Sequence, residues 1–379
     1  MRILHVDHSP VLGGAERSVL ELAAAQRRRG DDAMVAVGRP GTFSAALDAA
    51  GIPWTSLNLS KAFIETAAST RLLGFVTRAP AFFVSAVRLR RAASRVRPDV
   101  IQVHTRKAHL LASVAFLFCR TQLVWHLRDD VPQRRLARLL LRTGIRGAGH
   151  AVALSQWLAE NYRAHGLCPR SGRIGIVPSG IDGKALGRLP TPWLDGKRGP
   201  VVGYVGQIAD WKGPDLVVEA FERLEGPPDR QLVIAGDVLF PSADDGYEAR
   251  LDARIATSPE TDRIGRLRGV GPEEAFASID VLVHASIRPE PFGRVIVEAL
   301  AARRPVVALP RGAAPEILGQ GCGVLADGTD ATALAEALAK LLADPKAARR
   351  MTQAGVLRAA VFEPDAVAEH MAREYEVLG

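Results

Sequence analysis

Short apolar runs alternate with helical segments along most of the chain, and no other feature constrains the fold as strongly. In the first half, runs typical of buried strands lie at 1–7, 32–38, 99–104, 122–127 and 150–155. A glycine-containing loop follows the first run, and apolar residues then recur at helical spacing over 17–30, where Gly30 ends the pattern. This alternation predicts a parallel sheet covered by helices on both faces.

A second alternating series follows a Gly- and Pro-rich stretch at 187–200, which we interpret as a linker. Its expected strands lie at 200–206, 230–237, 280–286, 305–310 and 322–327, and a helical tail is interrupted at Pro345 and near Pro364. The predicted fold class is α/β, with two doubly wound, Rossmann-like domains at 1–186 and 201–362. Ligands of open α/β sheets bind at the carboxyl ends of strands, so we expect the site in a cleft between the two sheets.

Composition sets limits on compartment and anchoring. The three cysteines, Cys119, Cys168 and Cys322, fit neither a disulfide framework nor a zinc site, so we expect a reducing, cytoplasmic environment. The first apolar run is too short for a signal peptide, and no run reaches the roughly 18 apolar residues of a spanning helix.

Positive charge is concentrated at 71–146, where the only acids are Asp99, Asp129 and Asp130. Such a region favours an anionic partner, whereas composition alone favours a merely solvated arginine-rich surface. The segment 71–98 mixes aromatic, aliphatic and arginine side chains, so peripheral contact with anionic lipid and an ordinary helix pair both stay open. No recognition motif accompanies the charge, and we expect no nucleic-acid partner.

Two loops at predicted strand ends have residues suited to phosphate. Gly13 and Gly14 precede a helix, where glycine permits close backbone approach and the helix start offers free N–H donors. An ordinary tight turn explains these glycines equally well. Lys212 follows the strand that ends at Gly206 and precedes a helix starting near Pro214, so it is either a phosphate ligand or a solvated lysine.

The stretch RPEPFGRVIVEAL at 288–300 places two carboxylates around a turn. Glu290 lies in the loop after a buried strand, and Glu298 lies two turns into the next helix. Carboxylates accept hydrogen bonds from vicinal hydroxyls of a sugar or ribose. The first N–H groups of that helix would be available to phosphate, and they belong to Phe292, Gly293 and Arg294. A favourable helix-dipole interaction explains Glu290 tolerably but explains Glu298 poorly.

His104 and His126 end two strands of the first domain, where a histidine is as often structural as catalytic. Asp129 and Asp130 do not follow a strand in the manner of a metal-binding loop, and no zinc, EF-hand or hydrolase motif is present. We therefore expect no metal and no bound cofactor.

Several motifs together resemble the GT-B family 4 glycosyltransferases, over nearly the whole chain and in the family's order. They are GGAE at 13–16, PSGID at 178–182, VGQIADWKG at 205–213, LVIAGD at 232–237 and the E-x7-E stretch from Glu290 to Glu298. The resemblance implies transfer of a sugar from a nucleoside diphosphate sugar to an acceptor with retention of configuration. It also implies a C-terminal helix at about 363–379 that crosses back to the first domain.

Residue roles follow from the same resemblance. Glu290 would contact donor sugar hydroxyls, Glu298 the ribose, and Lys212 the diphosphate in place of a metal. Gly13 and Gly14 would give an acceptor-side loop its close approach to phosphate. His126 resembles the family's histidine beside the reacting sugar.

One position departs from the family pattern. The family usually has an arginine five residues before the lysine, where this chain has Gln207. An amide supplies neither charge nor a bidentate fork, so Arg288 and Arg294 are candidates to replace it. A UDP-sugar is the first expected donor and a GDP-sugar the second, with a glycan, lipid or small-molecule acceptor. A non-catalytic nucleotide-sugar scaffold and a nucleotide-sugar epimerase are the alternatives.

Overall fold

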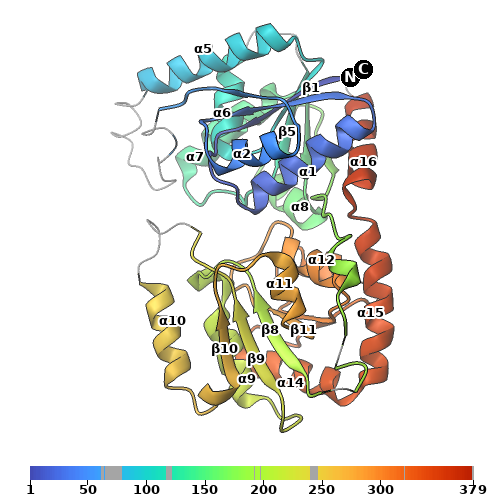
Figure 1. Ribbon diagram of the computed structural model, residues 1–379. Helices are drawn as coiled ribbons and strands as arrows, with labels where there is room; N and C mark the ends of the chain where they lie inside the picture. The colour runs from blue at the N-terminus through green and yellow to red at the C-terminus, as the bar shows by residue number, and fades with distance from the viewer. Residues whose placement is uncertain are drawn as a thin grey trace. The chain divides into compact units, whose positions relative to one another are not determined.

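The computed structural model describes residues 1–60, 64, 79–116, 122–191, 193–196, 198–239, 246–319 and 321–377 (Figure 1). It divides into two compact units, Met1–Gly180 together with Pro364–Gly379, and Ile181–Glu363. Each unit has one parallel sheet flanked by helices, so the protein has two Rossmann-like domains.

The first unit is built on a parallel sheet in the order β3-β2-β1-β4-β5-β6-β7. Its strands are β1 Arg2–Asp7, β2 Asp32–Val37, β3 Trp54–Ser56, β4 Val100–Val103, β5 Gln122–Leu127, β6 His150–Ala153 and β7 Ile174–Ile176. The central strands are buried on both faces, which explains why they appear in the sequence as continuous apolar runs. The strand order reverses between β1 and β4, which marks the carboxyl edge there as a ligand-binding position.

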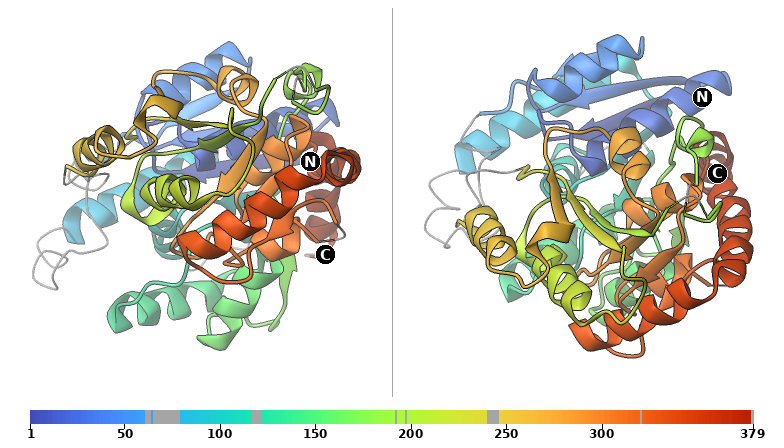
Figure 2. Two further views of the ribbon diagram at one scale, coloured as in Figure 1. Left: turned by 90° about the horizontal axis from the view of Figure 1, so that it is seen from below. Right: turned by 60° about the horizontal axis from the view of Figure 1, so that its bottom comes forward.

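Helices cover both faces of this sheet. They are α1 Gly14–Arg28, α2 Thr42–Ala49, α5 Ala79–Val96, α6 Arg106–Ala115, α7 Arg135–Gly147, α8 Gln156–Ala164 and α16 Pro364–Glu376. α6 packs against α5 and α7, and α1 lies beside α16 (Figures 1 and 2). α16 presents Val367, Met371 and Tyr375 at helical spacing to the same core as α1.

The second unit is built on a parallel sheet in the order β10-β9-β8-β11-β12-β13. Its strands are β8 Val201–Val205, β9 Gln231–Ala235, β10 Ile264–Leu267, β11 Val281–His284, β12 Val306–Ala308 and β13 Val324–Leu325. Its helices are α9 Pro214–Arg223, α10 Tyr247–Ala256, α11 Pro272–Ala277, α12 Arg294–Ala301, α13 Ala314–Ile317, α14 Ala331–Ala343 and α15 Pro345–Ala360.

The stretch interpreted as a linker, 187–200, lies within the range of the second unit, which begins at Ile181 rather than after residue 200. This stretch belongs to the second unit because Trp193 and Leu194 are buried in the core of that unit, each only 7% exposed. Among the described helices, none is both long enough and apolar enough to cross a membrane.

Candidate active site

Lys212 and Glu290 are brought together at the carboxyl edge of the second sheet. Lys212 ends a short 3-10 turn, Asp210–Lys212, between β8 and α9, and Glu290 lies in the loop between β11 and α12. Lys212 Nζ is 2.8 Å from Glu290 Oε1, with side chains 18% and 10% exposed. The two predicted ligand groups therefore form a largely buried ion pair with each other.

Two further side chains, which the sequence analysis did not identify, bind the same carboxylate. His284, the last residue of β11, has Nε2 2.9 Å from Glu290 Oε1. The Ser286 hydroxyl donates a hydrogen bond to that oxygen as well. The signal in the sequence was two polar residues at the end of an otherwise apolar strand, four and six residues before Glu290.

The environment keeps Glu290 ionised. Burial by itself would raise the pKa of Glu290, but the charges of Lys212 and His284 and their hydrogen bonds hold that pKa well below its usual range. An ionised carboxylate accepts hydrogen bonds only, so this group suits hydroxyl ligands.

The backbone around Glu290 is fixed by close packing. Gly312 has a φ of +58°, and a Cβ there would lie 2.4 Å from both N and O of Glu290. Ala313 N donates to the Glu290 carbonyl at 3.0 Å, and Ile287 N donates to the Trp211 carbonyl at 2.8 Å. The loop that carries Glu290 is thus tied to both the Lys212 loop and the segment after β12.

The start of α12 orders the rest of the predicted donor-binding set. Gly293 caps the helix with a φ of +96°, and the buried ring of Phe292 lies 5.5 Å from the ring of Phe362. Glu298 is half-buried, and its Oε1 accepts a hydrogen bond from Arg294 Nη2 at 3.2 Å. Arg288 is exposed and lies in the loop before Glu290.

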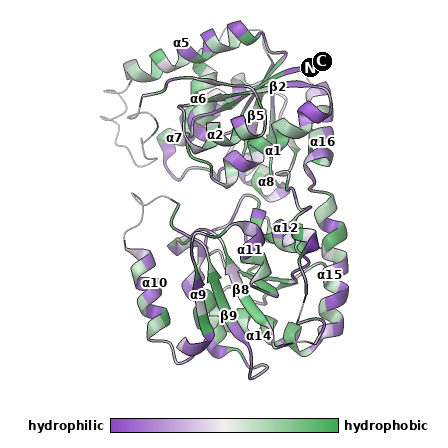
Figure 3. Cartoon of the chain, viewed as in Figure 1, coloured by the Kyte–Doolittle hydropathy of each residue, from purple (hydrophilic) through white to green (hydrophobic). Residues whose placement is uncertain are grey.

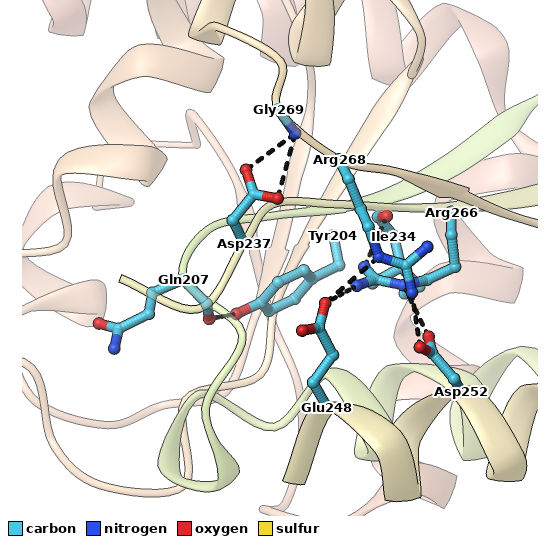
Figure 4. A network of polar contacts seen from close by, with 9 residues as sticks. All are labelled: Tyr204, Gln207, Ile234, Asp237, Glu248, Asp252, Arg266, Arg268 and Gly269. Carbon is cyan, nitrogen blue, oxygen red and sulfur yellow. Dashed lines mark hydrogen bonds and ion pairs between the residues drawn. The ribbon is translucent and has the colours of Figure 1, made fainter. Parts of the chain in front are cut away.

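Gln207 follows β8 and is held through its backbone. The Tyr204 hydroxyl donates to the Gln207 carbonyl at 2.5 Å, while the Gln207 amide points away from the Tyr204 ring (Figure 4). Figure 4 also shows the loop after β10, where Gly269 N donates to the Asp237 carboxylate at 2.9 and 3.1 Å.

Two arginines of β10 and the loop after it pair with carboxylates of α10. Arg266 contacts Glu248 at 3.1 Å and Asp252 at 3.2 Å, and Arg268 contacts the same two acids at 3.3 and 2.5 Å (Figure 4). These arginines therefore fix α10 to the edge strand.

The remaining predicted residues, Gly13, Gly14 and His126, belong to the first unit. Gly13 caps α1, and its N–H donates to Glu16 Oε2 at 3.0 Å. His126 is fully buried, with its ring nitrogens 2.9 Å from Gln102 Nε2 and 3.2 Å from the Val177 carbonyl. Burial and the charge of Arg128 hold the pKa of His126 well below its usual range.

A carboxyl pair lies beside the glycine loop. Asp7, the last residue of β1, is fully buried, and its Oδ2 atom makes no hydrogen bond. Burial and the charge of Asp7 raise the pKa of Glu16 to about 7. Within the described residues, no three His, Cys, Asp or Glu side chains are grouped to hold a metal ion.

Two family models match the chain: Glycosyltransferase Family 4 over residues 12–184 and Glycosyl transferases group 1 over residues 192–358. The D-inositol 3-phosphate glycosyltransferase of Corynebacterium efficiens is 35% identical over 289 residues, which are 72% of this chain and 65% of that protein. The GDP-mannose-dependent alpha-mannosyltransferase of Mycolicibacterium smegmatis is 35% identical over 189 residues, which are 48% and 44% of the two chains. The matches thus span less than two thirds of either relative.

Among solved structures, Anabaena HepE in complex with UDP-glucose is similar over the full length of both chains, with a TM-score of 0.80 and 25% sequence identity.

Proposed function

Because the chain belongs to the group 1 glycosyl transferases of family 4, we propose that it transfers a glycosyl group from a nucleoside diphosphate sugar to an acceptor. The observation that carries the proposal is the Lys212–Glu290 pair, with His284 and Ser286, at the carboxyl edge of the second sheet. A buried ammonium beside a carboxylate offers a cation to a diphosphate and an acceptor to sugar hydroxyls within one site.

We assign the donor groups as follows. Lys212 neutralises the diphosphate, Glu290 binds sugar hydroxyls and Glu298 binds the ribose. The N–H groups at the start of α12 contribute further donors to phosphate. Gly13 and Gly14 give the acceptor-side loop of the first unit its close approach to phosphate.

The reaction we propose retains the anomeric configuration through front-face substitution. The bond between C1 and the diphosphate oxygen breaks, and the acceptor oxygen attacks C1 from the same face. The departing phosphate oxygen takes the acceptor's proton. The protein contributes positioning and charge stabilisation. Lys212 and helix N–H groups supply the positive charge that a metal would otherwise provide.

We propose a UDP-sugar as first donor and a GDP-sugar as second. The similar HepE structure contains UDP-glucose, and the mycobacterial relative is named for GDP-mannose. For the acceptor we propose a polyol, a glycan or a lipid-linked sugar of the cell envelope, with the inositol phosphate in a relative's name as the first candidate to try.

Ligand binding and product analysis test this proposal. Nucleotide binding should raise the apparent Tm with UDP or GDP by mass action. NMR of the product should show the donor's anomeric configuration, and EDTA should leave the rate unchanged. If UDP, GDP, ADP and dTDP all leave Tm unchanged, the donor site is absent; an inverted product would refute the front-face route.

A non-catalytic nucleotide-sugar scaffold is a second candidate, and Gln207 is the observation that favours it. A neutral amide there gives the diphosphate one fixed charge fewer. Gln207→Arg should raise kcat by on the order of 10-fold if that charge is missing from a working site. A scaffold would bind UDP tightly yet gain no turnover from the substitution.

We further propose that the first unit rests peripherally on anionic membrane through α5 and α7. On α7, the side chains of Leu136 and Leu139 are 44% and 60% exposed, and arginines surround them in the sequence. No acidic residue occurs between Asp130 and Glu160. α5 has Phe83 64% exposed, and hydrophilic and hydrophobic residues alternate along it (Figure 3). The earlier part of the predicted lipid-binding segment, residues 71–78, lies outside the described residues.

Vesicle co-sedimentation tests this surface. The protein should bind vesicles rich in phosphatidylglycerol, dissociate at high salt and ignore phosphatidylcholine. Leu136→Glu with Leu139→Glu should weaken binding by on the order of 10-fold, because two anions join a basic apolar face. Leu357→Glu, at a site 75% exposed on α15, is the matched control. Equal loss in both variants would remove the surface proposed.

A further inference from the structure

Seven polar side chains in the first unit form one hydrogen-bonded chain beneath the carboxyl edge of its sheet. All are buried, and they are His5, Gln26, Gln102, His104, His126, Arg128 and Tyr375. They come from β1, β4 and β5 or the residues just after these strands, and from α1 and α16. Because the three strands are neighbours and side chains two residues apart share a face, the polar groups collect on the side that α1 and α16 cover.

In the first half of this hydrogen-bonded series, from Arg128 to Gln26, the donors and acceptors can be assigned in only one way. Arg128 cannot accept, so its Nε–H donates to His104 Nδ1 at 3.2 Å. A neutral His104 then donates its Nε2–H to His5 Nδ1 at 2.9 Å. His5 donates its own Nε2–H to Gln26 Oε1 at 2.7 Å. Each imidazole uses Nδ1 as acceptor and Nε2 as donor.

The second half continues in the same direction through the C-terminal helix. Gln26 Nε2 donates to the Tyr375 hydroxyl at 3.1 Å, and that hydroxyl donates to Gln102 Oε1. Gln102 Nε2 donates to His126 Nδ1 at 2.9 Å, and His126 Nε2 donates to the Val177 carbonyl at 3.2 Å. Every amide, hydroxyl and imidazole in this hydrogen-bonded series donates at least one hydrogen bond and accepts at least one.

Three neutral histidines are required for this arrangement. A proton added to any Nδ1 would place N–H against N–H inside a core, which is costly. Burial lowers the pKa of His5 to about 4 and holds the pKa of His104 and of His126 well below the usual range, consistent with neutral rings.

Arg128 is the end of this chain that reaches the sheet edge. It follows β5, is 8% exposed, and its Nη1 lies 3.5 Å from the Ala15 carbonyl, directly after Gly13 and Gly14. The carboxyl edge of a parallel sheet is where substrates bind in this fold class. His104 Nδ1 accepts from the Arg128 Nε–H, and Arg128 Nη2 lies 3.5 Å from His126 Nδ1, which accepts its shorter hydrogen bond from Gln102.

We propose that Arg128 binds the acceptor substrate, and that Tyr375 and Gln26 are positioning residues that fix its guanidinium through the tautomers of His5, His104 and His126. The proposal rests on the proposed glycosyl transfer for the nature of the substrate. It assigns His126 an indirect role, acting on Arg128 rather than on the sugar. The C-terminal helix thereby sets the geometry of a group that follows β5, far away in the sequence.

The test uses the full chain with Tyr375→Phe, which removes the one hydroxyl that joins the two halves. Tyr247→Phe removes a hydroxyl from α10 in the second unit, bonded there to Asp215, and serves as the matched control. In NMR at pH 7, the wild type should show neutral Nε2–H imidazoles for His5, His104 and His126 and a slowly exchanging Arg128 Nε–H. His5→Gln, His104→Gln, His126→Gln and Arg128→Lys assign these signals by their loss. This readout does not depend on activity.

Tyr375→Phe should speed exchange of the Arg128 Nε–H by on the order of 10-fold or more, whereas Tyr247→Phe should leave it unchanged.

With UDP-glucose and D-inositol 3-phosphate as probes, Tyr375→Phe and Arg128→Lys should both raise the acceptor KM by on the order of 10-fold and leave the donor KM unchanged. An unchanged Arg128 Nε–H signal in Tyr375→Phe overturns the positioning role. A raised donor KM instead, or a loss of kcat explained by lower Tm alone, overturns the acceptor assignment. If the wild type transfers no sugar from any of the proposed donors to any of the proposed acceptors, the proposed function fails, while the NMR result still decides the positioning role.

Discussion

Replacing Lys212 with methionine tests whether the buried carboxylate of Glu290 depends on its ammonium partner. Methionine keeps an unbranched apolar stem but removes the charge that lies 2.8 Å from Glu290 Oε1. His284 and Ser286 remain as hydrogen-bond partners. The variant therefore leaves an ionised group, 10% exposed, without its nearest fixed cation.

Removing one partner of a buried ion pair costs about 3–5 kcal/mol in free energy of unfolding. Because two hydrogen bonds to Glu290 survive, we expect the lower end, about 3 kcal/mol, for Lys212→Met. In a double-mutant cycle with Glu290→Gln, the coupling energy should be about 2 kcal/mol at pH 7.

The pH dependence has a definite sign. The folded pKa of Glu290 is depressed by Lys212 and His284 against the effect of burial, so its stabilising contribution is complete above the unfolded value of 4.5. It is lost as pH falls below that value, at about 1.4 kcal/mol per pH unit. Glu290→Gln should lack this slope.

Urea unfolding followed by tryptophan fluorescence measures both quantities. Trp211 lies 4.5 Å from Lys212 Nζ and reports on this part of the second unit. A coupling energy below roughly 0.5 kcal/mol at pH 7 is within ordinary additivity and would refute the reasoning. So would equal acid slopes in wild type and Glu290→Gln.

Three further outcomes follow from the site. Glu298→Ala should weaken UDP binding in calorimetry by on the order of 10-fold, whereas Glu290→Ala should lower turnover of UDP-glucose more than UDP affinity; equal effects on both would contradict separate ribose and sugar contacts. Gly312→Ala should abolish turnover, because the added Cβ would meet the Glu290 backbone. Gly269→Ala is its control: the added Cβ there has open space, so this variant measures only the strain of a positive φ in a residue other than glycine. As pH rises from 4.5 to 7, the free energy of unfolding of Glu16→Gln should increase by about 3 kcal/mol relative to wild type. The reason is that the Glu16 carboxyl ionises over this range in the unfolded chain but keeps its proton in the folded protein, where its pKa is about 7. A difference in urea unfolding that does not change with pH would contradict the raised pKa.

The alternation of apolar runs was sufficient to predict two doubly wound sheets, because strands buried on both faces must be apolar throughout. It missed the short strands β3 and β7 of the first sheet, and β10 and α10 of the second unit. β10 is an edge strand with half-exposed residues, and its Arg266 pairs with acids of α10, so neither element has the periodicity that was sought. The burial of Trp193 in the second core was hidden by the Gly and Pro residues around it.

The candidate site was predicted in its residues but not in its contacts. Lys212 and Glu290 are far apart in sequence, and their contact depends on two loops that Gly213 and Gly312 hold in left-handed conformations. Spacing reveals strand ends, yet it does not show that His284 turns its Nε2 to Glu290. The hydrogen-bond partner of His126, Gln102, also binds Tyr375 of α16, and no local pattern around residue 126 indicates that helix.

The placement of α16 also has a consequence for synthesis. Val367, Met371 and Tyr375 complete the core of the first unit, yet they follow the whole of Ile181–Glu363 in chain order. A ribosome adds roughly 5–20 residues per second, so the first unit waits on the order of 10–40 s for its last helix. During that interval the face of α1 that Tyr375 will cover, with Gln26, is open to water and to chaperones. A premature stop just before Pro364 would therefore leave the second unit's sequence entire, and the half that was translated first would be the one that stays unfinished.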